Sequence, residues 1–294
     1  MSVHTPSVPA MVVDLCARAG LPTTGLQPLR HHATGVYLLT DPQIVVRISP
    51  AHHLESQRRA LALTRWLKGH GVDVTAPCGL DQPVVHGDHL ATFWAYYPQQ
   101  GRPAPPPHHL GRILRRMHAL ADPPVELPSY TPLASLGRTL VTDTVLEPED
   151  RDWLTERRHH LLESYARLDF PLGPPRWIHG DAYPGNTLWA GSRVLLGDWD
   201  EAARGPRELD LANTLHGQRR FGRTSADIDA FWDAYQAPPR TWPGWRVLLD
   251  IRDLHTLSAF LRRAARPDVA AHREVRRRLA TLRAGDTTTA WTSA

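Results

Sequence analysis

The spacing of apolar residues changes along the chain. Short apolar runs at residues 36–39, 44–48 and 90–97 have the length and the β-branched or aromatic content of buried strands. From residue 110 onward apolar side chains recur at helical spacing, which predicts helices over residues 110–120, 148–168, 224–235, 245–264 and 272–284. The strands therefore gather on the N-terminal side and the helices on the C-terminal side.

Two further helices and a linker are predicted in the first part of the chain. Residues 11–19 have an amphipathic helical pattern, and a second helix should run through Leu54, Leu61 and Leu67. We expect Ser49 and Pro50 to cap this second helix, because serine before proline is a favourable helix start. A proline-rich stretch at residues 103–107 is the best candidate for a linker between two lobes.

A β-hairpin is predicted near the middle of the second half. The apolar runs 186–190 and 193–198 are separated by a Gly-Ser pair of the kind that forms two-residue turns. If the residues flanking that turn face each other, Asn186 lies opposite Gly197, at the same end of the hairpin as Asp198. Neighbouring side chains of a regular strand point to opposite faces, so the two polar side chains converge only if the strand ends are irregular.

The same region carries the residues that phosphoryl transfer requires. His179-Gly-Asp181-Ala-Tyr-Pro-Gly-Asn186 is followed at short range by Gly-Asp198-Trp-Asp. Phosphoryl transfer needs a carboxylate to accept the proton of the attacking hydroxyl, and oxygen ligands for Mg²⁺. Asp181 suits the first role, and Asn186 with Asp198 suits the second, because hard oxygen ligands favour Mg²⁺ over Zn²⁺. The pattern predicts a kinase of small molecules.

A His-Gly-Asp triplet can also be an ordinary turn, and the chain contains such a copy at residues 86–88. That copy lies between two apolar runs and has Phe93 five residues past its aspartate, where a metal ligand would be needed. We interpret it as a hairpin turn without chemistry. The copy at residues 179–181 is the one that has every further part.

At these residues the chain resembles the aminoglycoside phosphotransferase family, the protein-kinase-like group that also includes choline kinases. In that family a His-Gly-Asp-x-x-x-x-Asn loop is followed by an Asp-Trp element, and then by a Gly-Pro step leading to Asp-Leu-Ala. Here these parts are His179 to Asn186, Asp198-Trp199, Gly205-Pro206 and Asp210-Leu211-Ala212.

The resemblance implies an α+β, two-lobed protein-kinase-like fold. A small N-terminal lobe with an antiparallel sheet, residues 1–97, would cover the nucleotide. A larger, mainly helical C-terminal lobe, residues 98–294, would hold the catalytic and acceptor-binding residues. The implied cofactors are Mg²⁺ and ATP or GTP. The implied roles are a catalytic carboxylate at Asp181, metal ligands at Asn186 and Asp198, and supports of the loop by hydrogen bonds at His179 and Asp210.

The predicted hairpin of residues 36–39 and 44–48 resembles the nucleotide-covering hairpin of this fold, with Arg47 in place of the usual lysine. Lys68, the only lysine of the chain, falls in a predicted helix and cannot take that strand position. Arginine can hold phosphate oxygens in a bidentate fork, so Arg47 is a candidate phosphate ligand. The alternative is an exposed strand arginine without a ligand.

The other predicted nucleotide contacts are less distinctive. The loop before the hairpin contains a single glycine, whereas a phosphate-binding loop normally needs several; Thr34 and Gly35 are its candidates. By the resemblance, adenine would contact the backbone from Trp94 to Tyr97, including Tyr96. Ala60 occupies the place of the glutamate that pairs with the strand lysine in relatives, and Glu55 is the nearby acid that could compensate.

Composition bounds the choice of partner and compartment. With 294 residues, 41% hydrophobic and 22% charged, the chain has the composition of an ordinary globular protein large enough for two lobes. The net charge of +4 comes from arginines scattered among acids, so we expect no nucleic-acid partner. Two cysteines, no secretory leader pattern and no apolar run long enough for a membrane predict a cytoplasmic protein that acts away from the membrane.

The acceptor is the least determined part of the prediction, and the sequence identifies no substrate-binding residue. The His-Arg-Asp, Asp-Phe-Gly and Ala-Pro-Glu landmarks of protein kinases are missing, so the expected partners are a nucleotide and a small molecule with a hydroxyl. An antibiotic, with the protein as a resistance kinase, is the preferred interpretation. A kinase of a sugar, amino-alcohol or nucleoside metabolite stays open, as does a nucleotide-binding pseudokinase that binds a partner protein.

Overall fold

The structure is a computed structural model that describes residues 9–30, 35–142 and 145–292. Its described residues form two compact units. The sheet unit contains the residues up to 105 together with 120–127 and 186–202, and the helical unit contains residues 106–119, 128–185 and those from 203 onward. A division into functional lobes after residue 97 stays a prediction. Within the described ranges, every helix is too short or too polar to cross a membrane.

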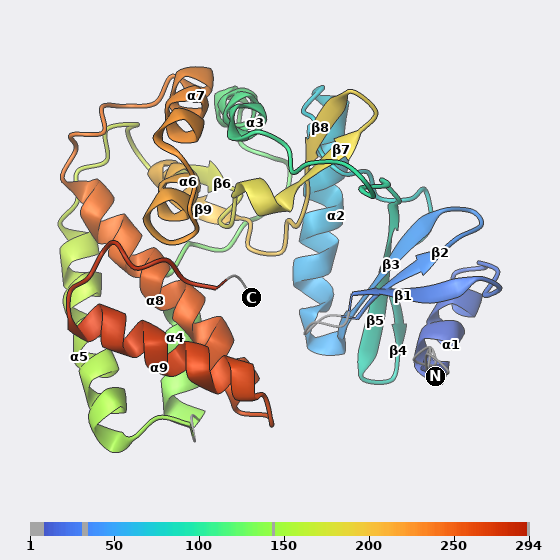
Figure 1. Ribbon diagram of the computed structural model, residues 1–294. Helices are drawn as coiled ribbons and strands as arrows, with labels where there is room; N and C mark the ends of the chain where they lie inside the picture. Colours follow the sequence, from blue (N-terminus) through green and yellow to red (C-terminus); the bar gives the residue numbers. More distant parts are fainter. Residues whose placement is uncertain (1–8, 31–34, 143–144, 293–294) are drawn as a thin grey trace. The chain divides into compact units, whose positions relative to one another are not determined.

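The sheet unit is built on a five-stranded antiparallel sheet (Figure 1). Its strands, in the spatial order β1-β2-β3-β5-β4, are β1 (Leu26–Arg30), β2 (Val36–Leu39), β3 (Ile44–Pro50), β5 (His89–Ala95) and β4 (Val84–His86). Helix α1 (Ala10–Arg18) packs against β4 and β5. The strands expected at residues 36–39, 44–48 and 90–97 are confirmed, with ends that differ by a few residues.

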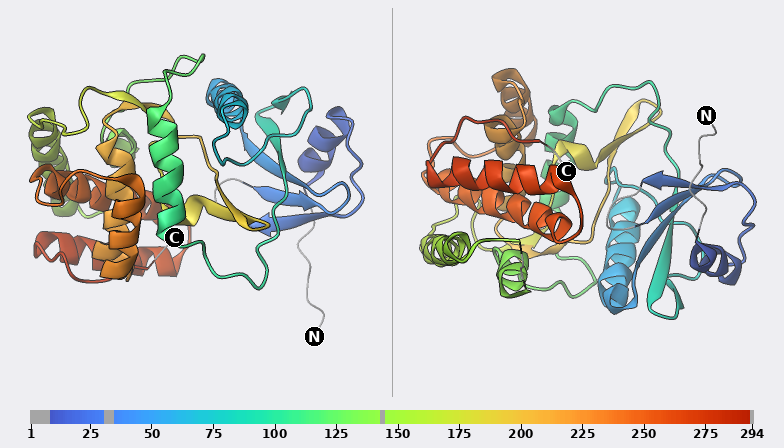
Figure 2. Two further views of the ribbon diagram at one scale, coloured as in Figure 1. Left: turned by 90° about the horizontal axis from the view of Figure 1, so that it is seen from above. Right: turned by 60° about the horizontal axis from the view of Figure 1, so that its bottom comes forward.

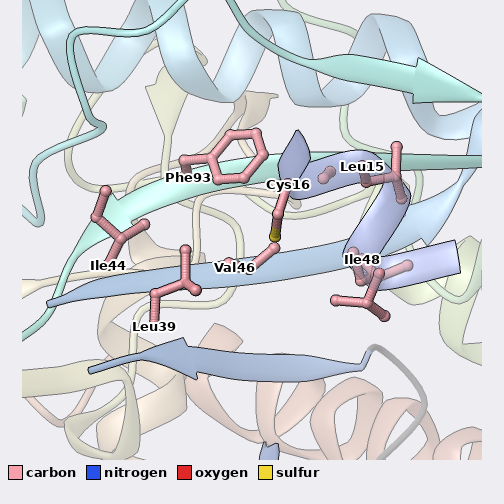
Figure 3. Close-up of a cluster of buried hydrophobic side chains, with 9 residues drawn as sticks. Leu15, Cys16, Leu39, Ile44, Val46, Ile48 and Phe93 are labelled. Carbon is pink, nitrogen blue, oxygen red and sulfur yellow. The ribbon is translucent and has the colours of Figure 1, made fainter. Parts of the chain in front are cut away.

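The core of the sheet unit determines which way β3 faces (Figure 3). Val46 and Ile48 are buried together with Leu15 and Cys16 of α1 and with Phe93 of β5. Side chains alternate across a strand, so Arg47 lies on the face opposite to this cluster. Because the hydrophobic core covers one face of β3, the side chain of Arg47 lies on the second face of the sheet.

Helix α2 (Leu54–Gly69) follows a short 3₁₀ turn, η1 (Ala51–His53). The expectation that Ser49 caps this helix is wrong, because β3 continues to Pro50 and Ser49 lies opposite Leu90 in the sheet. Ser49 is buried, and neither η1 nor α2 has a side-chain hydrogen bond at its N-cap. Ser49 therefore belongs to the sheet, where it pairs with β5, and does not begin the helix.

Two hairpins of the sheet unit have the predicted turns. In the first, His86 of β4 faces His89 of β5, and Gly87 between them has φ +56°, so the first His-Gly-Asp triplet is a hairpin turn. In the second, β7 (Thr187–Ala190) pairs with β8 (Arg193–Leu196), with Ala190 opposite Arg193. The backbone N–H of Gly197 donates to the carbonyl of Asn186 over 2.9 Å, which confirms the predicted register.

The helical unit contains seven helices within its described residues and one small sheet. The helices are α3 (Pro107–Ala119), α4 (Ala134–Thr142), α5 (Pro148–Ala166), α6 (Glu208–Arg220), α7 (Ser225–Tyr235), α8 (Gly244–Ala264) and α9 (Val269–Arg283), and the sheet pairs β6 (Arg176–Ile178) with β9 (Ala203–Gly205). Helix α8 packs against α9, and α3 against α7 (Figure 2). A Cβ at Gly111 of α3 would lie 2.6 Å from the carbonyl oxygen of Phe231, so this glycine permits the close approach of α3 and α7.

Five of these helices match the predicted ones, and α4 and α6 were missed. Helix α6 buries its residues all round, including Asp210, Asn213, His216 and Arg220, so it has no apolar stripe for a pattern to detect. Three of these polar side chains, those of Asp210, His216 and Arg220, instead bond the helix to its neighbours.

One buried ion cluster joins α6 to α8. The carboxylate of Asp253 accepts hydrogen bonds from Arg220 Nε and Nη2, both at 2.8 Å, and lies 2.9 Å from His216 Nε2. Burial raises the pKa of Asp253, but Arg220 and His216 outweigh it and hold the pKa below its usual value. Burial lowers the pKa of His216 to about 4 in spite of Asp253, so this histidine is neutral in the folded protein.

We expect the free energy of unfolding to fall as the pH is lowered from 7 to 5. The unfolded chain binds a proton at His216 near pH 6.5, whereas the folded protein binds it only near pH 4. This difference favours unfolding by about 2 kcal/mol at pH 5. Urea unfolding at both pH values should show a smaller fall for His216→Gln than for the wild type. The matched variant of an exposed histidine, His159→Gln, should keep the wild-type fall, and equal falls in all three proteins would contradict the assignment.

Candidate active site

The loop that carries Asp181 is fixed by a buried carboxylate. Asp210, in the first turn of α6, is fully buried and accepts the backbone N–H groups of His179 and Gly180 over 2.8 and 2.9 Å. A third bond comes from His118 of α3, whose Nε2 lies 3.1 Å away. Burial raises the pKa of Asp210, but the hydrogen bond and charge of His118, the charge of His179 and the backbone bond hold it below its usual value. The carboxylate therefore stays ionised as the acceptor for the loop.

The backbone turns sharply between Asp210 and Asp181. Gly180 has φ +84°, a conformation that costs glycine little and other residues more. The N–H of Asp181 donates to Nδ1 of the buried His179 over 3.3 Å. Each of the three residues 179–181 thus has its backbone N–H bonded within the helical unit.

The side chain of Asp181 projects from this fixed loop and forms an ion pair. Its Oδ1 accepts from Nη2 of Arg252 in α8 over 2.8 Å, and the side chain is 25% exposed. Arg252 is itself buried, and its Nε has no hydrogen-bond partner among the described residues. The arrangement is an accessible carboxylate whose orientation is set by a buried guanidinium.

In the sheet unit, the polar end of the β7–β8 hairpin has the irregular backbone that convergence requires. Asp198 follows β8 with φ +63°, a left-handed conformation that is uncommon for a residue with a side chain. Trp199 next to it is 2% exposed, and its indole N–H donates to the carbonyl of Leu196 over 3.3 Å. The alternation of the strand therefore ends at Leu196, and the bond between Gly197 and Asn186 keeps Asn186 at the same end of the hairpin.

Arg47 meets two carboxylates at this end of the hairpin. Its Nη2 donates to Asp198 Oδ1 over 2.9 Å and to Asp200 Oδ2 over 3.0 Å. Burial lowers the pKa of Arg47, but the charges of Asp198 and Asp200 raise it above the usual value, so the guanidinium stays charged. Arg47 is thus an ion-paired residue on the second face of the sheet and not an isolated strand arginine.

The remaining predicted nucleotide contacts lie around this sheet. Thr34 lies outside the described residues. Gly35 accepts the N–H of Ile48 with its carbonyl, and a Cβ there would lie 2.9 Å from the ring of Tyr37. Trp94 is buried, with its indole N–H bonded to Thr92, and Tyr96 donates its backbone N–H to Gln43. A role for any of them in binding nucleotide stays a prediction.

Glu55, the nearby acid that could compensate for Ala60, is engaged elsewhere. Ala60 is buried in α2. Glu55 is exposed and pairs with Arg58 one turn along the same helix, at 2.8 Å. The carboxylates that pair with Arg47 come instead from the segment after β8.

The residues of the hairpin end fit a divalent cation. Asp198 and Asp200 direct two carboxylate oxygens at one positively charged nitrogen, so their oxygens already converge on a single positive charge. The second oxygen of Asp200, Oδ1, is buried without a hydrogen-bond partner among the described residues. Carboxylate and amide oxygens are the ligands that Mg²⁺ accepts, and it completes its shell with phosphate oxygens and water.

Three residues of these sites escaped sequence analysis. Arg252 is 71 positions from Asp181, and His118 is 92 positions from Asp210; neither lies in a motif that could have indicated the contact. Asp200 did carry a signal, because the sequence Asp198-Trp199-Asp200 places two acids on either side of a large apolar residue.

Together, the antiparallel sheet, the helical second part and the acid-bearing loop and hairpin define a kinase-like fold. The profile of the Phosphotransferase enzyme family matches residues 25–248, which is more than half of the chain. The chain therefore belongs to the phosphotransferase enzyme family, as the resemblance to aminoglycoside phosphotransferases predicted.

Solved structures of small-molecule kinases are similar over nearly the whole length. An amicoumacin kinase in complex with AMP-PNP and Ca²⁺ is 14% identical, with a TM-score of 0.73 over 96% of this chain and 95% of that one. A microcompartment-associated aminopropanol kinase is 16% identical, with a TM-score of 0.68 over 95% and 99% of the two chains. A choline/ethanolamine kinase family protein from Mesorhizobium loti is 19% identical, with a TM-score of 0.65 over 94% and 93%. These similarities confirm the predicted fold class.

We expect Asp210→Asn to destabilise the protein strongly. The amide keeps the shape of the carboxylate but loses its negative charge and one of its two acceptor oxygens. The bonds to two backbone N–H groups and to His118 are weakened or lost, so the free energy of unfolding should fall by about 2 to 4 kcal/mol. Urea unfolding at pH 7 measures this loss. Asp233→Asn, at an exposed position of α7, should change the value little, and an equally small change for Asp210→Asn would contradict the role of Asp210.

Proposed function

We propose that the protein is a Mg²⁺-dependent O-phosphotransferase that moves the terminal phosphoryl group of ATP or GTP to a hydroxyl of a small molecule. The observation that carries the proposal is the carboxylate of Asp181, accessible at the end of a loop whose backbone is fixed by the buried Asp210. Membership of the phosphotransferase enzyme family supports the reaction class.

In this proposal Asp181 is the catalytic carboxylate. It orients the acceptor hydroxyl and accepts its proton as the oxygen forms a bond to the phosphorus atom. The bond between that phosphorus atom and the bridging oxygen breaks, and the nucleoside diphosphate leaves with the electron pair. Arg252 holds Oδ1 of Asp181, which restricts the orientations of the carboxylate before the acceptor arrives.

Asn186 and Asp198 are the proposed metal ligands, with His179 and Asp210 as supports of the catalytic loop. A bound Mg²⁺ would neutralise the charge on the phosphate oxygens during transfer. Arg47, on the second face of the sheet, is the proposed phosphate ligand from the protein. It stays charged at any physiological pH, because its two carboxylate partners raise its pKa.

For the acceptor we propose an antibiotic, with the protein acting in the cytoplasm as a resistance kinase. Similar structures include the amicoumacin kinase, and also the aminopropanol kinase, so a metabolite hydroxyl is the second candidate. The ion pair between Asp181 and Arg252 brings a positive charge to the proposed base, which disfavours acceptors with several ammonium groups around the reacting hydroxyl. A pseudokinase is the remaining alternative, and it requires no turnover.

We expect Asp181→Ala to lower turnover by about 100-fold or more, the usual scale for loss of a positioned general base. The assay incubates the protein with Mg²⁺, ATP or GTP and a pooled panel of antibiotics and hydroxylated metabolites, and detects an added phosphate by mass spectrometry. Asp169→Ala, at an exposed position, is the matched control. Turnover by Asp181→Ala close to that of the wild type would rule out Asp181 as the base.

Asp198→Ala should abolish the metal-dependent part of nucleotide binding, because it removes the proposed carboxylate ligand. Calorimetric titration with AMP-PNP, with and without Mg²⁺, measures that part directly. A variant that retained the wild-type gain in affinity from Mg²⁺ would contradict the assignment. If the wild type bound Mg²⁺-nucleotide but phosphorylated no compound of the panel, the pseudokinase alternative would gain support.

A further inference from the structure

We propose that Asp200 is a positioning residue that retains Arg47 when Asp198 turns to the metal. This inference rests on the proposed function, since it assumes that Asp198 is a metal ligand. Arg47 Nη2 now lies between the two carboxylates, 2.9 Å from Asp198 Oδ1 and 3.0 Å from Asp200 Oδ2. Nη2 of Arg47 is thus shared by two carboxylates, and the proposal gives these carboxylates different roles.

The shared contact creates a competition. A metal held by Asp198 would compete with Arg47 for Oδ1 of Asp198, and a guanidinium of low exposure with neither a carboxylate nor a phosphate beside it would be costly. The side chain of Arg47 is 18% exposed. Glu55 of α2 already pairs with Arg58, and position 60 is an alanine.

Asp200 has a second carboxylate oxygen with which it can hold Arg47 when Asp198 is no longer its partner. Its Oδ2 is already bonded to Arg47, while its Oδ1 is buried and has no hydrogen-bond partner in the described parts of the chain. A rotation of the guanidinium toward Asp200 would convert the shared contact into a two-point pair with both oxygens, the strongest geometry that arginine and carboxylate form. Arg47 would then be held in place while Asp198 is released.

The surroundings of Asp198 and Asp200 support different roles for these two residues. Trp199 between them is buried and bonded to Leu196, so it fixes the segment from which both acids project. Asp198 is the more exposed of the two, at 48% for its side chain against 31% for Asp200. The more accessible acid suits an incoming cation, and the less accessible one suits a permanent partner for Arg47.

A double-mutant cycle tests this role through the Mg²⁺ concentration that gives half-maximal binding of AMP-PNP. In Asp200→Asn, Arg47 has Asp198 as its remaining carboxylate and competes harder with the metal, so the required Mg²⁺ concentration should rise by about threefold to tenfold. In an Arg47→Met background the competitor is gone, and Asp200→Asn should change the requirement by less than about twofold. Asp73→Asn, which removes a carboxylate from the ion pair with Arg193 in the same unit, is the control and should behave as the wild type.

Two results would overturn the proposal. If Asp200→Asn raised the Mg²⁺ requirement equally in both backgrounds, Asp200 would be a metal ligand. If it raised the requirement in neither, Asp200 would have no role in the exchange.

The same cycle in thermal unfolding with EDTA needs neither metal nor nucleotide. Asp200→Asn should lower the melting temperature of the wild type, yet leave unchanged or raise that of Arg47→Met, where Asp198 and Asp200 repel each other without a cation between them. Equal lowering in both backgrounds would contradict the pair. A wild type that bound no Mg²⁺-nucleotide would contradict the proposed function, while this unfolding cycle would still decide whether Asp200 holds Arg47.

Discussion

The helical unit depends on one requirement, that the buried carboxylates of Asp210 and Asp253 have bonding partners at both oxygens. Asp210 meets it by accepting the backbone N–H groups of His179 and Gly180 and a bond from His118, and Asp253 meets it through Arg220 and His216. Both arrangements involve α6. Because an unpaired buried charge is far more costly than a lost apolar contact, the loop and the helices have little freedom to separate. The position of Asp181 follows from this requirement more than from its own contacts.

The sheet unit achieves a comparable order by a different route. Its core side chains fill one face of β3, and the alternation of the strand then gives the other face to Arg47. At the polar end of the β7–β8 hairpin, a buried tryptophan and a left-handed aspartate replace the regular pleat. Packing of the core holds the strands, and the irregular backbone after β8 sets the directions of Asp198 and Asp200. Strained backbone of this kind persists where the surrounding structure holds it, and it is commonest at functional sites.

The sequence was most informative where local rules decide the outcome. The register of the β7–β8 hairpin followed from its two-residue turn, and five helices of the helical unit followed from periodicity. It was least informative where distant residues decide, as for the pair of Asp181 with Arg252 and for α6, whose buried polar residues conceal its period. The helix cap expected at Ser49 was wrong because pairing with β5 competed for the same residue. Local pattern thus predicted the elements and the motif, while the supports of the motif required the fold.

The two-residue turn of the β7–β8 hairpin also limits how related chains can vary in length. Ala190 faces Arg193 at the turn, and Asn186 lies opposite Gly197 at the polar end. The length of the two strands therefore fixes how far Asn186 and Asp198 lie from the turn. A residue inserted within either strand would shift Asn186 relative to Asp198 and reverse the faces of the side chains beyond it. An insertion at Gly191 and Ser192 would lengthen only the turn. Evolutionary insertions, and grafted tags or fluorescent labels, should therefore be tolerated at the turn and excluded from the strands.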